Sequence, residues 1–340
     1  MSRSKALQYY VAARVVLAPL MLLTVVTLVF LLLRSTPGDP IDALLTDRAS
    51  PEAKEELRVR LGLDKPLWVQ YFAYMGGLLH FDLGNSIVRS GQPVSEIIGT
   101  YFPATVELAV YSMAIALLVG IGIGVFSASR PNGLIDAGGR LFSIISYALP
   151  IFWVGMIMQL IFAVQLGWFP VGGRWDNSTP PQIITGLYTI DSLLSGNIDQ
   201  FFTSFHYLAL PCLTLGVLLS GMFERMVRVN LKEALKADYV EAARARGIPE
   251  KRILLAHALK NALIPVITIV VLTIATLLGG AVLTEVTFSW DGLGYQLYDA
   301  ISKKDFPVVQ GVMVFFGAIV TIASILIDVV NAYIDPRIRY

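Results

Sequence analysis

Six long apolar stretches divide the chain, at residues 15–33, 104–127, 141–164, 207–227, 262–283 and 308–332. Crossing the ~30 Å apolar layer of a bilayer takes about 20 residues of α-helix, and each stretch is close to that length or longer. The pattern therefore predicts an all-α membrane protein with six transmembrane helices. An even number of spans places both termini on the same side of the membrane.

The first apolar stretch follows three basic residues, as the apolar core of a signal peptide does. However, residues 15–33 are longer than the 7–15 residues of a typical signal-peptide core, and no small-residue cleavage site precedes Arg34. We therefore expect residues 15–33 to be a retained transmembrane helix.

Basic residues are concentrated beside alternate connections, and this bias predicts the orientation. One side carries Arg3, Lys5 and Arg14, Arg130 and Arg140, nine basic residues from Arg225 to Lys260, and Arg337 and Arg339. The short connections on the other side carry only Arg174, Lys303 and Lys304. The bias predicts that the amino tail (1–14), the loop at 229–260 and the carboxyl tail (334–340) are cytoplasmic. It also predicts that residues 34–102 are external and precede a core at 103–333.

The external segment contains two predicted helices. Ser50, Pro51 and Glu52 are typical of a helix start, and that helix ends near residues 61–62. A second helix begins near Leu67 and concentrates aromatic and apolar side chains, among them Tyr71. It is predicted either to lie at the membrane interface and brace the spans or to form a lid packed on the protein itself.

Two further external loops join the spans. The loop at 165–206 is rich in Gly, Pro, Ser, Thr and Asn, and its fold is left open. The loop at 284–307 combines Gly turns with aromatic side chains, which are typical of a membrane interface. A more specific interpretation makes Trp290, Tyr295 and Tyr71 contacts for an external partner.

The cytoplasmic loop predicts a helix, a glycine elbow and a second helix. Asp238 and Glu241 have the spacing of a capping-box pair, Gly247 suits a left-handed helix end, and Pro249 suits the first turn of the next helix. Small residues give the first helix a low profile on which another backbone could lie closely, with charge around it. The small residues are Ala242, Ala243 and Ala245, and the basic residues are Arg244, Arg246, Lys251 and Arg252. The shape predicts a docking surface.

Composition agrees with a membrane protein and narrows the possible chemistry. Of the 340 residues, 55% are hydrophobic and 15% are charged, and the net charge of +1 does not suggest nucleic acid. The single cysteine, Cys212, lies in an apolar stretch and is expected to be a buried packing residue. The three histidines fall in different loops without metal-site spacing, and neither a phosphate-binding loop nor a nucleophile elbow occurs. The pattern predicts a non-catalytic chain that binds no ATP, metal or cofactor itself.

Polar and proline residues inside the spans need an interpretation. Glu107 and Asp328 lie near span ends, from which each could reach headgroups or water, so a structural role is favoured over a substrate or proton site. Pro150, Pro211 and Pro265 release backbone carbonyls that neighbouring helices or water must satisfy. A kinked helix lining a path is one use of such prolines, and ordinary bundle packing is the commoner one.

These residues resemble the permease subunits of bacterial ABC importers, within the dipeptide, oligopeptide and nickel branch. The central match is Glu241-Ala242-Ala243 followed after three residues by Gly247, in the loop before the penultimate span. Further matches, in order, are Pro-Gly-Asp-Pro at 37–40, Leu-Gly-Leu-Asp-Lys-Pro at 61–66, Asp-Leu-Gly-Asn-Ser at 82–86, Pro-Ala-Thr-Val-Glu-Leu at 103–108, His-Ala-Leu-Lys-Asn-Ala at 257–262, Thr-Glu at 284–285 with Phe-Ser-Trp-Asp-Gly-Leu-Gly at 288–294, and Asp-Pro-Arg-Ile-Arg at 335–339. Lys260 stands where the broader importer pattern has proline, which is typical of the peptide branch.

The resemblance implies a type I importer permease fold and an assembly in the bacterial inner membrane. A second, similar permease, two ATPase subunits that hold ATP and magnesium, and an extracytoplasmic substrate-binding protein are the implied partners. It also implies that the ATPase contacts Asp238, Tyr239, Glu241, Ala242, Ala243, Arg244, Gly247 and Lys251. Transport then follows alternating access, driven by ATP on the partner chains.

Two alternatives to a peptide importer remain at this point. An ion-coupled secondary transporter is expected to show inverted repeats and carboxylates near mid-membrane, which fits this chain poorly. Within the same family, nickel or glutathione importers share the pattern. The sequence does not name the substrate.

Overall fold

The computed structural model describes residues 3–35, 41, 50–60, 62–176 and 179–334, with the backbone alone for residues 3–15, 53, 57 and 328–334. In this part of the chain the regular structure is helical, apart from one isolated antiparallel bridge between Asn85 and Pro93. The all-α class predicted from the apolar pattern is therefore confirmed for the described residues.

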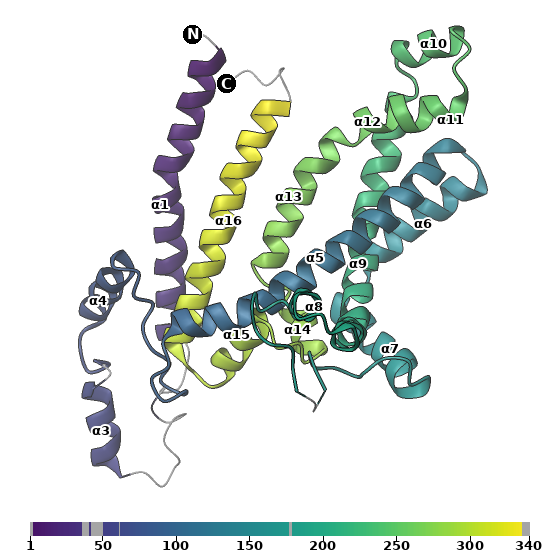
Figure 1. Ribbon diagram of the computed structural model, residues 1–340. Coiled ribbons are helices and arrows are strands. Elements are labelled where there is room, and N and C mark those ends of the chain that lie inside the picture. Colours follow the sequence, from purple (N-terminus) through teal and green to yellow (C-terminus); the bar gives the residue numbers. More distant parts are fainter. Residues whose placement is uncertain (1–2, 36–40, 42–49, 61, 177–178, 335–340) are drawn as a thin grey trace.

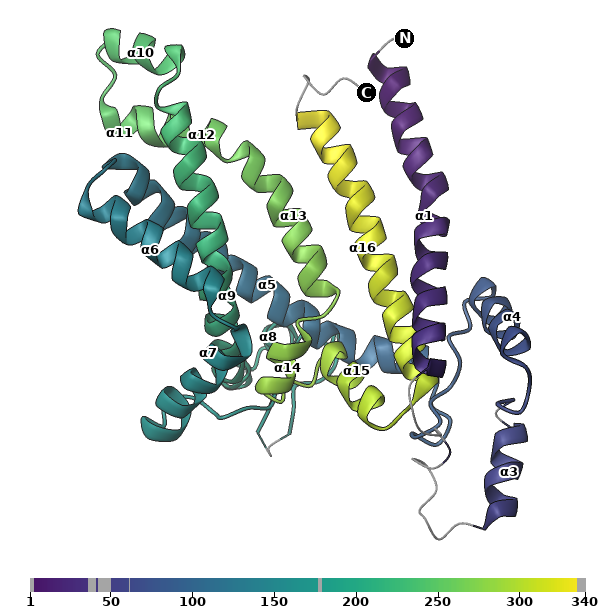
Figure 2. The same cartoon turned by 180° about the vertical axis from the view of Figure 1, so that it is seen from behind.

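Four long helices are each apolar enough to cross a membrane: α1 (Arg3–Ser35), α5 (Val94–Ser129), α9 (Ile198–Ala234) and α16 (Phe306–Ile334). In both views α1 lies alongside α16, and α13 (Ile264–Leu278) lies on the other side of α16 (Figures 1 and 2). Helices α5, α6 (Leu134–Ala148) and α9 form a second group. A helix satisfies its own backbone polar groups, so it is the form that such apolar segments take in a bilayer.

Two of the predicted spans are bent. Helix α7 (Ile151–Met158) continues into the π-helical segment η1 (Gln159–Gln165). The bend between α6 and this continuous segment is 101°. Helix α13 follows the short helices α11 (Glu250–Arg252), η2 (Ile253–Ala258) and α12 (Leu259–Ala262) at 52°. Pro150 and Pro265 stand at the start of the helix after each bend, because proline lacks the N–H that would continue the preceding helix.

The bend between Ala148 and Ile151 corrects the prediction of one continuous helix at 141–164, whereas the bend between Ala262 and Ile264 falls at the start of the second stretch, 262–283. The second of these stretches also stops early, because α13 ends at Leu278 and Gly280 has a φ of 113°. The described residues contain four helices that could span a membrane, or up to six if each bent pair counts as one span.

Glycines allow α5 and α9 to pack closely. A Cβ atom added at Gly120 would lie 2.7 Å from the carbonyl oxygen of Ser220, and one at Gly124 would lie 2.8 Å from Cβ of Val227. Small residues of this kind let helices in a membrane approach each other and gain van der Waals contact. Cys212 is buried in the same core, as predicted.

The external segment contains α3 (Pro51–Arg60) and α4 (Leu67–Leu79). Helix α4 packs on the outer half of α1: the hydroxyls of Tyr71 and Thr27 are 2.7 Å apart, and the Tyr71 ring contacts Phe30 edge to face. These contacts favour the bracing interpretation. The remaining short helices, α8 (Tyr188–Leu194), α14 (Val282–Thr287) and α15 (Leu293–Ser302), lie at the same end as the start of α5 (Figure 1).

Helix α10 (Asp238–Ala245) and α11 lie at the opposite end, beyond the spans. The first turns of α1 and the last turns of α16 point to that same end in both views (Figures 1 and 2). Helices α10 and α11 thus stand beyond the bundle, where another protein can reach them, whereas Leu231 and Ala258 of the same loop are buried against Ala128 of α5.

Candidate functional site

Helix α10 begins without a side-chain cap. Its N-cap is Ala237 in an extended conformation, and Asp238 and Glu241 both lie in the first turn. The capping box predicted for these two residues is therefore wrong. Their carboxylates still lie near the positive end of the helix, where negative charge is favourable.

The elbow after α10 is a Schellman motif. The N–H of Gly247 donates to the carbonyl of Arg244, at 2.9 Å, and the N–H of Ile248 donates to the carbonyl of Ala243, at 3.2 Å. Gly247 itself has a φ of 71°, which glycine adopts without the Cβ penalty of other residues. The predicted left-handed helix end is confirmed. Pro249 lies just before α11 rather than inside it.

A small apolar cluster holds α10 on the helix that follows. Val240 and Ala243 are buried against Ile253, with Leu235 and Ile248 packed around them. Ala243 thus belongs to the underside, although the sequence placed it on the docking face. The opposite face of α10 is exposed and carries Asp238, Tyr239, Glu241, Ala242 and Ala245.

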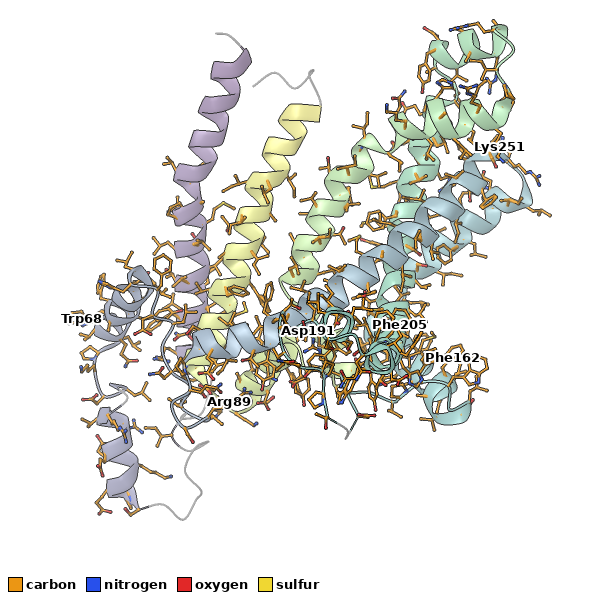
Figure 3. The ribbon with its side chains drawn as sticks, viewed as in Figure 1. Trp68, Arg89, Phe162, Asp191, Phe205 and Lys251 are labelled. Atoms are coloured by element: carbon orange, nitrogen blue, oxygen red, sulfur yellow. The ribbon has the colours of Figure 1, made fainter. Side chains whose placement is uncertain are left out.

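An ion pair closes the elbow. Arg244 Nε and Glu250 Oε1 are 2.6 Å apart, and a second nitrogen of Arg244 lies 3.2 Å from Glu250 Oε2. This pairing raises the pKa of Arg244 and lowers that of Glu250. Both groups are exposed, so the pair fixes geometry more than it adds stability. Lys251 lies at this end of the molecule (Figure 3) and lines a cavity of about 560 Å³ with Lys232 and Lys236, between the elbow and the α5–α6 connection.

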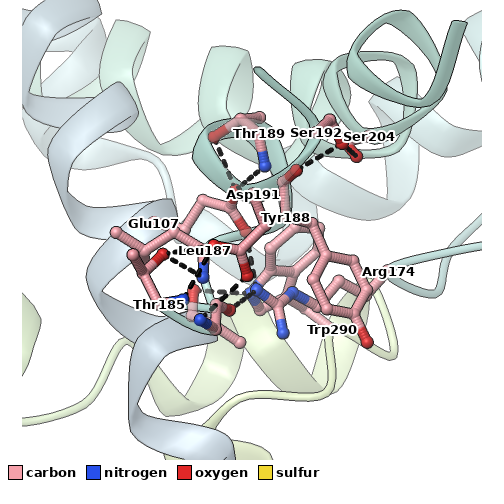
Figure 4. A network of polar contacts seen from close by, with 12 residues as sticks. Glu107, Arg174, Thr185, Leu187, Tyr188, Thr189, Asp191, Ser192, Ser204 and Trp290 are labelled. Carbon is pink, nitrogen blue, oxygen red and sulfur yellow. Dashed lines mark hydrogen bonds and ion pairs between the residues drawn. The ribbon is translucent and has the colours of Figure 1, made fainter. Parts of the chain in front are cut away.

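Glu107 is buried, although its position near a span end suggested contact with headgroups or water. Because α5 begins at Val94, Glu107 lies inside the helix, and it is 2% exposed. One of its oxygens accepts from Arg174 at 2.9 Å, and the other accepts from both the N–H and the hydroxyl of Thr189 (Figure 4). Glu107 therefore does not reach headgroups or water, and its contacts agree with the structural role that was favoured from the sequence.

Arg174 ties the loop at 165–206 to this network. It also donates to the carbonyl of Gly186, and its guanidinium carbon lies 3.7 Å from the centre of the Tyr188 ring (Figure 4). Asp191, at the same end of the molecule, accepts from the N–H groups of residues 184–186. The hydroxyl of Thr185 also donates to Asp191. Burial acts to raise the pKa of Asp191, but these hydrogen bonds together lower it. The loop that the sequence left open is thus anchored by two buried carboxylates.

Trp290 is part of this packing and does not form an outer contact surface. It is 1% exposed and its indole N–H donates to the carbonyl of Ala104 at 2.9 Å. The prediction that its side chain meets an external partner is wrong for this conformation. Glu285 lies close by, bonded to the Thr105 hydroxyl and the N–H of Tyr295. Burial raises the pKa of Glu285 to about 7, against these hydrogen bonds.

The other predicted contacts have separate positions. Tyr295 is partly exposed, and Tyr71 is engaged with α1. Asp328 lies in α16, but its side chain is outside the described residues. No group of three metal-ligating side chains comes together in the described part of the chain.

Sequence reasoning missed Arg174, Asp191 and Asp305 as organising residues. Asp305 accepts from the Ser86 hydroxyl and the N–H of Ile87, joining the start of α16 to a loop more than 200 residues earlier in the chain. A lone charged residue in a polar loop gives no sign of its burial. The carboxylate partner of Arg174 and the partners of Asp305 are distant in the sequence, so no local pattern could have found them. Asp191, in contrast, accepts from residues only five to seven positions earlier in the same loop.

Proteins of known family are similar to this chain over nearly its whole length. A family model described as "Binding-protein-dependent transport system inner membrane component" matches residues 120–340, and its N-terminal companion matches residues 7–109. The chain is 39% identical to the dipeptide transport system permease protein DppB of Alkalihalophilus pseudofirmus, over 98% of this chain and 100% of the relative. It is 41% identical to the di/tripeptide permease protein DppB of Pseudomonas aeruginosa, over 93% of this chain and 94% of the relative. It is 36% identical to the oligopeptide permease protein AppB of Bacillus subtilis, over 97% and 99%.

Proposed function

This chain belongs to the family of binding-protein-dependent transport system inner membrane components, and we propose that it is the membrane-spanning permease subunit of an ATP-driven importer of di- or oligopeptides. Relatives that align over nearly the whole chain are peptide permease components, which supports peptides over nickel or glutathione. The same relatives argue against an ion-coupled secondary transporter.

The exposed face of α10 is the observation that carries this proposal. It stands beyond the spans, it has small side chains at Ala242 and Ala245, and it is fixed to the bundle by the elbow and the apolar cluster below. A surface that transmits force must move as one body with the helices behind it. We assign this face, from Asp238 to Gly247 with Lys251 beside it, to an ATPase subunit.

Transport follows from the preference of ATP for one arrangement of the ATPase pair. A ligand shifts a two-state equilibrium only by its difference in affinity for the two states. When ATP draws the ATPase subunits together, the coupling loop at 229–260 moves with them, and the spans reorient to open the pathway outward. Hydrolysis of ATP and release of its products return the coupling loop and the spans to their first arrangement. In this proposal ATP and magnesium bind to the ATPase chains, and this chain catalyses nothing.

The proposed assembly places six spans in the bacterial inner membrane, with the tails at 1–14 and 334–340 in the cytoplasm. The side on which basic residues gather supports this orientation, as does the position of both helix ends on the α10 side. A second, similar permease, two ATPase subunits and an extracytoplasmic binding protein complete the system. Since Trp290 is buried, we place the binding-protein contact on α15, where Tyr298 is 50% exposed.

The test is to reverse a charge on the exposed face of α10 or to replace the glycine of the elbow with a charged residue. Glu241→Lys and Gly247→Asp are expected to abolish co-purification of the ATPase subunits and substrate-stimulated ATP hydrolysis, while the permease still inserts. Glu56→Lys on external helix α3 is the matched control, because it makes the same charge change at an exposed position on the other end. If both ATPase binding and stimulated hydrolysis survive the α10 changes, the assignment of this surface is wrong.

A further inference from the structure

A groove runs along the outer side of the α6–α9 helix pair, with a volume of about 580 Å³. Helix α6 packs on α9 and α5 and lies at the edge of the molecule in both views (Figures 1 and 2). Its outward face is apolar and exposed at Leu141 and Ile145. The groove therefore opens at the periphery of the bundle.

Close packing of the two helices forms the floor of the groove. The hydroxyl of Ser143 donates to the carbonyl of Gly221 at 2.8 Å, and a Cβ atom added at Gly221 would lie 2.6 Å from that of Ser146. Helices this close to each other do not separate readily, so the groove is a fixed feature of the pair.

Three arginines line one end of the groove, and no carboxylate does. Arg228 is neutralised, because it pairs with Glu224 at 3.0 Å and approaches Asp136 at 3.7 Å. Arg140 and Arg225 are exposed, and within the described residues neither forms an ion pair. Two positive charges are thus left over at this end.

The other end of the groove is apolar. Ile144 and Tyr147 of α6 line it, opposite Met222 of α9, and Tyr147 is 85% exposed. Arg140 and Tyr147 are seven residues apart, which is about 10 Å along a helix. Arg140 is the one nearer Leu134, where α6 begins, so the charged end faces the side of the molecule that carries α10.

We propose that this groove binds an anionic phospholipid from the leaflet on the α10 side, with its phosphate on Arg140 and Arg225 and an acyl chain along Ile144, Tyr147 and Met222. Guanidinium groups bind phosphate oxygens in pairs, and arginine side chains extend from a span toward the headgroups. Basic pockets between membrane helices are suited to anionic headgroups. The inference is independent of what the protein transports.

The experiment measures lipid retained by the complete transporter in nanodiscs of phosphatidylcholine with a minor fraction of phosphatidylglycerol, by native mass spectrometry. The wild type is expected to retain phosphatidylglycerol selectively. Arg140→Gln and Arg225→Gln are each expected to weaken retention about fivefold, the effect of one basic residue near an anionic surface. Arg60→Gln, which removes the same charge from exposed external helix α3, is expected to change nothing.

The occupant is identified by placing the photocrosslinker p-benzoylphenylalanine at position 147. An adduct with phospholipid supports the proposal, whereas an adduct only with another protein subunit overturns it. Displacement of the lipid by inorganic phosphate alone would show a simple anion site and would also overturn it. Equal retention of phosphatidylcholine and phosphatidylglycerol would also overturn the proposal. So would unchanged retention of phosphatidylglycerol after both arginines are replaced.

Discussion

Replacing Gly247 tests whether the elbow must be rigid for the α10 surface to transmit movement. Gly247 has a φ of 71°, and a Cβ atom added there would meet nothing within 4 Å. The cost of a side chain is therefore conformational and not steric: about 1–2 kcal/mol for alanine in the left-handed region. Asparagine is expected to cost less, because its side chain tolerates that region better.

A penalty of that size changes the equilibrium between the closed elbow, with α10 packed on Ile253, and an opened elbow by a factor of roughly 5–30. Gly247→Ala should raise amide hydrogen exchange in α10 and lower substrate-stimulated ATP hydrolysis by the complete transporter, and Gly247→Asn should lie between alanine and wild type. Gly122→Ala is the control, because Gly122 also has open space around it but lies within α5. Alanine behaving like glycine, or asparagine behaving worse than alanine, would refute the reasoning.

Three further predictions test other parts of the structure. Gly120→Ala forces a contact with α9 and should destabilise the purified permease by about 1–3 kcal/mol. Gly122→Ala, which meets nothing, should stabilise it slightly. Equal thermal unfolding temperatures for the two variants would contradict the close packing. Glu107→Gln should cost about 3–5 kcal/mol by leaving Arg174, 9% exposed, without its partner, and Arg174→Gln in the same chain should recover part of that loss in a double-mutant cycle. The pKa of Glu285 is raised from 4.5 to about 7, so the folded state binds the proton more tightly than the unfolded state. The contribution of Glu285 to stability is then greatest below pH 4.5 and falls as the pH rises to 7, by on the order of 3 kcal/mol. Glu285→Gln should remove this contribution from the pH dependence of thermal stability.

The local patterns of the sequence determined the elements whose cause is local. Apolar runs of sufficient length marked the spans, because a bilayer leaves a segment of that composition few other forms. Gly247 marked the elbow, because a left-handed helix end has a strong preference for glycine. The resemblance carried by Glu241 to Gly247 indicated the family, which the relatives confirm over nearly the full chain.

Tertiary structure alone decided which face each residue presents and which distant residue it meets. The sequence put Glu107 at a membrane boundary and Trp290 on an outer surface, whereas both are buried against partners from other elements. It placed Ala243 on the docking face, but packing against Ile253 turns that residue inward. Pro150 marked a place where a helix could kink, but the apolar run around it did not reveal that the bend is 101°, since composition sets the length of a span and not its direction. Burial and direction depend on contacts between residues far apart in the chain, and the basic groove beside α6 exists only because α9 brings Arg225 next to Arg140.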